Sequence, residues 1–314
     1  MHMNILNDIV LPAGRSAIEL SLFVLLPVMV VMLTLMRLLE ARGILDWLVA
    51  RIAPALRPFG LTGLGVFAAL QINLVSFAAP VATLAMMEQR GASDRHLAAV
   101  FAMVLAMAQA NATFPMASMG LSMGWTLVWS VVGGLIAAAV CYHGFGRTLD
   151  MAEKLEDESL RHPVAESAKG VLDVINHAGA EAFRISVSSI PMLVLSLVVV
   201  TALRQFGAIA ALTAWIAPGL TMVGIDPALI LPTLTKYLAG GTAMMGVVDE
   251  MVRKSQMPAA LLNASAGFLI HPLDIPGIAV LASAGRRVAA VWKPAVAGAA
   301  VGILVRTVLH IFLC

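Results

Sequence analysis

The sequence predicts an all-α polytopic membrane protein, built as an inverted repeat of six transmembrane helices, two re-entrant helical hairpins and two interfacial helices. Of the 314 residues, 60% are hydrophobic and only 12% are charged, and the mean hydropathy is +0.93. A soluble domain carries roughly 25% charged residues. Several apolar stretches are long enough to cross a bilayer, and two of them are interrupted by glycine, threonine or proline. Non-helical backbone at membrane depth occurs only where protein buries it or where it lines a cavity.

Composition also excludes several classes of protein. The formal net charge is +2 and no basic stripe occurs, so no nucleic-acid partner is expected. The two cysteines, Cys141 and Cys314, lie beside apolar runs and predict neither a disulfide framework nor a thiolate metal site. No Walker loop, catalytic triad or HExxH helix is present, and we expect no enzyme activity and no cofactor. The first sixteen residues lack a basic region and a cleavage site, which predicts no removable signal peptide.

The first repeat is predicted to cover residues 1–145. In chain order it holds a span at 17–36, an interfacial helix at 43–58, a hairpin at about 60–90 with its tip at 75–80, a span at 96–118 broken near 111–115, and a span at 125–143. Residues 146–184 are charged and polar, which predicts a cytoplasmic linker. The second repeat, 185–314, is expected to hold a span at 185–203, an interfacial helix at 207–222, a hairpin at 226–254, a broken span at 258–283 and a last span at 293–313.

This repeat follows from one gap-free register with an offset of 164 residues. Two proline pairs and two glycine pairs match in it, together with apolar positions: Pro27 with Pro191, Gly43 with Gly207, Pro54 with Pro218, Gly60 with Gly224, Leu74 with Leu238 and Met87 with Met251. A chain rich in apolar residues gives leucine matches by chance, but it does not explain the matched prolines and glycines. Because each repeat has three spans, the second copy would be inverted relative to the first, an arrangement that suits alternating access.

Orientation follows from the lysines and arginines near the span ends. Fourteen fall on one side of the predicted topology, including the cations of the linker, and four fall on the other. The side with fourteen is expected to be cytoplasmic, so both termini would lie outside. We expect location in a bacterial inner membrane, and a homo-oligomer, either dimer or trimer.

Two stretches resemble a known family. The run from Asn73 to Glu88 (NLVSFAAPVATLAMME) resembles spore maturation protein A, and the run from Tyr237 to Gly246 (YLAGGTAMMG) resembles its B-type counterpart. Both belong to the nucleoside recognition, or Gate, family, which is similar to the core of concentrative nucleoside transporters. The resemblance implies a solute site between two hairpin tips and two broken helices, with Na⁺ or H⁺ coupling. Those transporters carry a Gln-Thr-Glu run in the first hairpin, whereas this tip has no carboxylate.

Polar residues near the four interruptions are the candidate site, because polar side chains at membrane depth usually face a cavity or a partner. Asn73 and Ser76 could contact solute or cap the inner helix of the first hairpin. Gln109, Asn111 and Thr113 alternate, which favours either an unwound helix that frees carbonyls before Pro115 or a locally satisfied proline kink.

The second half offers a further set of candidates. Gly240 and Gly241 allow a tight reversal, and Thr242 then lies at a helix N-terminus, either as an anion- or carbonyl-binding group or as an ordinary cap. His271 and Asp274 could carry a proton or a cation, or form a mutually satisfied pair. Two ligands alone seldom hold a metal. We expect Lys236 to reach the interface, with Asp249 or Glu250 as possible partners, and Glu88 to be solvated.

The sequence supports two functions from different classes. The first is a secondary transporter of a small polar solute, nucleoside- or nucleobase-like, coupled to Na⁺ or H⁺. The second is a channel-like gate or membrane scaffold that acts with a partner protein and has no transport cycle. Transport predicts saturable, ion-dependent uptake, whereas a gate or scaffold predicts a partner that can be cross-linked.

Overall fold

The computed structural model describes residues 5–152, 170–222 and 224–313, and within these ranges all regular structure is helical. Cys314 and three linker cations, Lys154, Arg161 and Lys169, lie outside them. Five helices of the described residues are long and apolar enough to cross a membrane. They are Leu6–Ala41, Asp94–Ala117, Met123–Phe145, Val171–Gln205 and Trp292–Phe312. The predicted all-α membrane fold is confirmed, although the sixth predicted span, 258–283, consists of two shorter helices.

The first half begins with a helix that is longer than the predicted span at 17–36. It is continuous from Leu6 to Ala41. It comprises a π-helical turn Leu6–Val10, α1 (Leu11–Ile18), a π-helical segment Glu19–Leu25 and α2 (Leu26–Ala41). The helices that follow are α3 (Ile44–Leu56) with a 3₁₀ turn Arg57–Phe59, α4 (Gly63–Leu74), α5 (Pro80–Gln89), α6 (Asp94–Ala106), α7 (Ala110–Ala117), and α8 (Met123–Val140) with a π-helical end Cys141–Phe145.

The second half presents a similar order of helices. They are α9 (Val171–Gln205), α10 (Ala208–Met222), a 3₁₀ turn Pro227–Leu229, α11 (Ile230–Ala239), α12 (Gly241–Arg253), α13 (Ala259–Leu269), α14 (Ile275–Ala282), α15 (Arg286–Ala290) and α16 (Trp292–Leu313). The glycines that the sequence pairs at an offset of 164 also share a backbone conformation. Gly43 and Gly207 have φ of 66° and 75°, and Gly60 and Gly224 have φ of 78° and 76°.

Local sequence explains where the helices of the two hairpins begin and end. We call α4 with α5 the first hairpin, and α11 with α12 the second hairpin. The first turns over Val75–Ala79, and α5 starts with Pro80, a residue suited to a first helical turn. The second turns at Gly240 alone, with φ 89° and ψ 170°, a conformation that is essentially confined to glycine.

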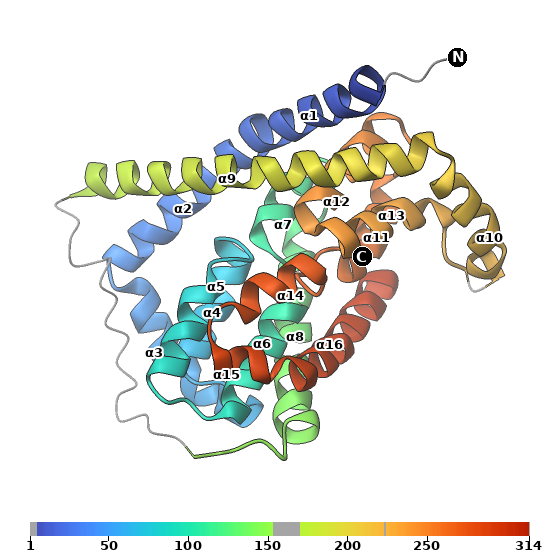
Figure 1. Ribbon diagram of the computed structural model, residues 1–314. Helices are drawn as coiled ribbons and strands as arrows, with labels where there is room; N and C mark the ends of the chain where they lie inside the picture. Colours follow the sequence, from blue (N-terminus) through green and yellow to red (C-terminus); the bar gives the residue numbers. More distant parts are fainter. Residues whose placement is uncertain (1–4, 153–169, 223, 314) are drawn as a thin grey trace.

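The core is centred on α6, where every side chain from Leu97 to Ala106 is at most 1% exposed. The helices α8 and α16 pack against α6 and against each other. They approach closely because both contribute glycine: a Cβ on Gly302 would lie 2.3 Å from the carbonyl oxygen of Gly133. On another side of the molecule α9 runs beside α1 and crosses α2 (Figure 1).

The predicted linker 146–184 is wrong at its C-terminal end, because residues 171–184 belong to α9. This segment is rich in charged residues, but its apolar residues have helical spacing: Val174, Ala178 and Ala182 recur every four residues and are buried. Arg37 of α2 pairs with Glu181 at 2.9 Å, which joins α2 to this part of α9. The rest of the predicted linker lies largely outside the described residues.

The predicted break near 111–115 is also wrong in its position. Helix α6 ends at Ala106 and α7 begins at Ala110, so Asn111, Thr113 and Pro115 are helical and the break covers 107–109. Inside α7, Pro115 has no N–H to donate and so removes one backbone hydrogen bond, but the helix continues past it to Ala117. Side chains of two other helices bond to backbone groups at this break. The Ala108 N–H donates to Ser130 Oγ of α8 (2.7 Å), and the Ala106 carbonyl accepts from Arg306 of α16.

Candidate functional site

Four interruptions of the helical backbone are joined by side-chain contacts. They are the tips of the two hairpins, the α6–α7 break at 107–109 and the α13–α14 break at 270–274. At the first of these contacts the Asn111 side chain is 4% exposed and reaches both hairpin tips. Its Oδ1 accepts from the Phe77 N–H (3.3 Å) and its Nδ2 donates to Thr242 Oγ1 (3.2 Å). One amide of α7 therefore links segments more than 130 positions apart.

Glycine lets the second tip approach its neighbours. A Cβ on Gly241 would lie 1.6 Å from Gln109 Nε2, so any other residue would overlap that amide. A Cβ on Gly240 would meet Pro276 at 3.7 Å and Asp274 Oδ1 at 4.0 Å. Gln109, itself 2% exposed, is the residue that precedes α7. The second tip thus lies against both helix breaks.

Asp274 and Lys236 form a buried ion pair at the α13–α14 break. Asp274 Oδ1 accepts from the Gly277 N–H (2.7 Å) and thereby caps α14, while Oδ2 accepts from Lys236 Nζ (3.2 Å). Lys236 Nζ lies 3.4 Å from the Leu273 carbonyl oxygen, to which it also donates. The two side chains are 3% and 0% exposed. The prediction that Lys236 reaches the interface is therefore wrong, because a partner from a distant segment holds it in the core.

His271 is fully buried beside this pair but is not bonded to Asp274. Its Nδ1 accepts from the Leu273 N–H (3.1 Å), which leaves the proton of a neutral imidazole on Nε2. The Tyr237 ring lies 6.3 Å away, between ring centroids. The alternative of a mutually satisfied His–Asp pair is therefore wrong: Asp274 takes Lys236 instead, and His271 bonds to its own turn.

Three other predicted site residues have local roles in the structure. Asn73 Oδ1 accepts from Ser130 Oγ (2.7 Å), the same hydroxyl that receives the Ala108 N–H, so Asn73 supports the α6–α7 break. Thr113 Oγ1 donates to the Gln109 carbonyl (3.0 Å) within α7. Ser76 is buried at the first tip and lines a cavity.

Arg306 of α16 is the main residue that the sequence analysis missed. Its side chain is fully buried, and Nη1 donates to the Ala106 carbonyl, where α6 ends, and to the Ile270 carbonyl (3.1 Å), where α13 ends. One guanidinium thus caps the helices that lead into both breaks. An arginine near the middle of an apolar span was the available signal, since ionisable residues at membrane depth usually mark function.

Two cavities lie between the long helices and the hairpins. One, of about 680 Å³, is bordered by α2, α9 and the first hairpin, including Ser76, Gln71 and Thr83. The other, of about 530 Å³, is bordered by α1, α9 and α12. Several lining positions correspond at the 164-residue offset: Leu33 with Leu197, Arg37 with Thr201, Glu40 with Arg204, Ala82 with Gly246, Ala85 with Asp249 and Met86 with Glu250.

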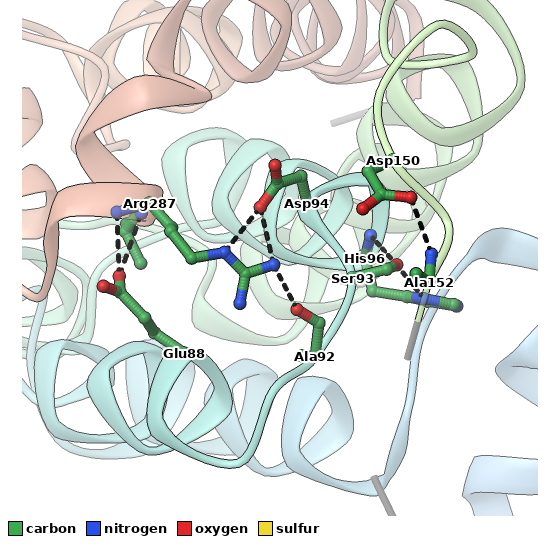
Figure 2. Close-up of polar contacts among 9 residues, drawn as sticks. Glu88, Ala92, Ser93, Asp94, His96, Asp150, Ala152 and Arg287 are labelled. Carbon is green, nitrogen blue, oxygen red and sulfur yellow. Dashed lines mark hydrogen bonds and ion pairs between the residues drawn. The ribbon is translucent and has the colours of Figure 1, made fainter. Parts of the chain in front are cut away.

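The hairpin exits are tied to different neighbours. Glu88, at the end of α5, accepts at Oε2 from the N–H groups of Arg287 and Val288, both at 3.1 Å, and so caps α15 (Figure 2). Arg287 in turn pairs with Asp94 at 2.6 Å and donates to the Ala92 carbonyl. The expected solvation of Glu88 is only partial, because the residue is half-buried and its Oε2 caps α15. At the other exit Glu250 pairs with Arg204 (2.9 Å) and Lys254 (2.6 Å).

Known proteins resemble this chain in sequence and in fold. The family model for the Gate domain, described as nucleoside recognition, matches residues 22–125. No curated protein gives a match. Among solved structures, CNTnw in an inward-facing substrate-bound state is similar with a TM-score of 0.66 and 17% identity, over 93% of this chain and 75% of that one. An outward-facing CNTnw variant gives a TM-score of 0.68 at 17% identity, over 92% and 75%.

The chain therefore has the same fold as CNTnw. The resemblance to the Gate family is shown over residues 22–125, which include the first of the two short stretches, and the fold of the solved structures agrees with it. The candidate residues of the tips and breaks stay predictions about binding, although the structure brings most of them together.

Proposed function

We propose that this protein is a secondary transporter of a small polar solute, nucleoside- or nucleobase-like, that is coupled to Na⁺ or H⁺ and works by alternating access. The observation that carries the proposal is the Asn111 amide, which contacts both hairpin tips beside two helix breaks. Interrupted helices at membrane depth are where transporters bind solute. The proposed contacts are Ser76, Gln109, Asn111, Gly240, Gly241, Thr242, His271 and Asp274, with Asn73 and Thr113 in support.

The organisation of the chain supports alternating access. We take 1–145 and 171–314, with the second bound moved to the start of α9, as inverted repeats joined by a cytoplasmic linker, with both termini outside. The two cavities at equivalent positions support an exchange of conformation between the repeats. We further propose a bacterial inner-membrane location and a dimer or trimer. Asp274 and His271 are the proposed carriers of the coupling ion.

Uptake into proteoliposomes tests the proposal. Radiolabelled nucleosides and nucleobases are offered with an imposed Na⁺ or proton gradient. We expect saturable, gradient-dependent uptake that Asn111→Leu reduces at least tenfold. The matched control is Asn263→Leu, because Asn263 also joins two segments, through the Ser122 N–H and the Gly120 carbonyl, but does so away from the tips. Equal loss in both variants would contradict the assigned role of Asn111.

A gate or scaffold acting with a partner is the second candidate. The hydrogen bond between Asn111 and Thr242 would also close a gate, since it joins the second tip to α7. This function predicts no uptake of any solute in the panel, together with a specific protein cross-linked to the intact chain in native membranes. Saturable uptake by the purified protein alone would exclude it.

A further inference from the structure

The buried centre carries an excess of positive charge. Lys236 and Arg306 are both fully buried, and of the carboxylates that the structure describes only Asp274 lies with them, paired with Lys236. Arg306 donates to two backbone carbonyls, and its Nε and Nη2 have no hydrogen-bond partner among the described residues. A buried, unbalanced charge is costly unless something compensates it.

Helix dipoles do not remove this excess. The ends of α6 and α13 face Arg306 with their negative poles. However, four helices end at the interruptions (α4, α6, α11 and α13) and four begin there (α5, α7, α12 and α14). Their partial charges therefore cancel to a first approximation, and one positive charge remains.

Hydrogen-bond donors without partners gather at the same place. The N-terminus of α12, a helix of 13 residues, has no side-chain cap, because Gly240 precedes it. Gln109 is 2% exposed, its Nε2 has no partner in the described part of the chain, and it lies 1.6 Å from where a Gly241 Cβ would be. Its amide is thus directed at the start of α12.

We infer that the site takes an anion: the solute carries a carboxylate or a comparable small anionic group, which binds at the N-terminus of α12 beside Gln109. This inference rests on the proposed function and narrows its solute class. Free backbone N–H groups and the positive pole of a helix bind anions. Lys236 and Arg306 supply the compensating charge, and the Gln109 amide supplies a donor. The absence of a carboxylate from the first hairpin tip fits the same chemistry.

The first test places the negative charge in the protein itself. Gln109→Glu is nearly isosteric and puts a carboxylate at the N-terminus of α12. We expect the Tm of the full-length protein in nanodiscs to rise by about 3 °C, because a negative charge at a helix N-terminus is stabilising. The matched control, Gln71→Glu, lies in α4 at a cavity wall and should not raise the Tm. A lower Tm for Gln109→Glu would overturn the inference.

The second test measures ligand charge with matched pairs of probes: nicotinate against nicotinamide, and orotate against uracil. In wild-type protein each anion should bind at least tenfold more tightly than its neutral counterpart. Arg306→Lys keeps the charge and should keep this preference, whereas Arg306→Gln should reduce it to about threefold or less. If Arg306→Gln does not fold, the wild-type comparison decides alone.

The outcomes separate the inference from the proposed function. Equal or tighter binding of the neutral members, or no binding of any anion, would overturn the anion site. Uptake of a neutral nucleoside into proteoliposomes would in that case still support transport. Anion binding without any uptake would support the site and contradict the transporter.

Discussion

The buried pair of Lys236 and Asp274 yields the sharpest stability prediction. Asp274→Asn removes the carboxylate bonded to Lys236 and turns an amide donor or a neutral oxygen toward its ammonium group. Lys236 then keeps only the Leu273 carbonyl, at 3.4 Å. Breaking a buried ion pair on one side costs about 3–5 kcal/mol, and we expect a loss in this range for the free energy of unfolding.

The two partners should not be equivalent. In Lys236→Met the Asp274 carboxylate keeps its bond to the Gly277 N–H and its place at the N-terminus of α14. The positive pole of a helix stabilises a carboxylate at its N-terminus by about 0.3–1 kcal/mol, whereas the Lys236 ammonium left by Asp274→Asn has no such compensation, so Lys236→Met should cost up to about 1 kcal/mol less than Asp274→Asn. The double variant Lys236→Met/Asp274→Asn leaves no charge unpaired at this position. It should be more stable than Asp274→Asn alone.

Unfolding of the four proteins in the same nanodiscs or detergent provides a double-mutant cycle. Thermal and denaturant unfolding should both rank wild type first and Asp274→Asn last. If the losses of the single variants simply add in the double variant, Lys236 and Asp274 do not interact as described, and the reasoning is refuted.

Three further predictions concern the tips and breaks. Gly240→Ala forces a φ of 89° on a residue with a Cβ and should lower the free energy of unfolding by about 1–3 kcal/mol. The control Gly14→Ala lies in open space within α1 and should not destabilise the protein. A comparable loss of stability in Gly14→Ala would refute the strain argument. Gly241→Ala should lower the Tm because its Cβ overlaps Gln109. The double variant Gly241→Ala/Gln109→Ala removes the overlap and should regain most of the lost Tm. If it does not, the overlap is not the cause. Ser130→Ala removes the hydroxyl that joins Asn73 to the Ala108 N–H. It should lower the free energy of unfolding by about 1–3 kcal/mol, as expected for a buried donor left without a partner. The control is Ser283→Ala, whose exposed hydroxyl bonds to the Val280 carbonyl and whose loss should be near neutral in the same unfolding assay.

Much of the fold was predictable because the relevant signals are local. Apolar length identifies the long helices, and Pro80 and Gly240 mark the starts of the helices that leave each tip. The α13–α14 break was also predictable, since His271, Pro272 and Asp274 interrupt an apolar run and Asp274 caps the next helix. The α6–α7 break was displaced in the prediction because Pro115, the visible helix breaker, is tolerated inside α7, whereas Ser130 and Arg306 act on the backbone from other helices.

The sequence by itself determined the all-helical membrane class and the polar residues that interrupt the apolar segments, because hydropathy and backbone preference are properties of neighbouring residues. The repeat stays a prediction. Tertiary structure alone decided the partners. It paired Lys236 with Asp274 rather than with an acidic residue closer in the sequence. It also brought Asn111 to both tips and placed Arg306 at the ends of α6 and α13. The physical reason is that a buried polar group must find its partner in space, and a partner from another helix leaves no mark in the sequence around it.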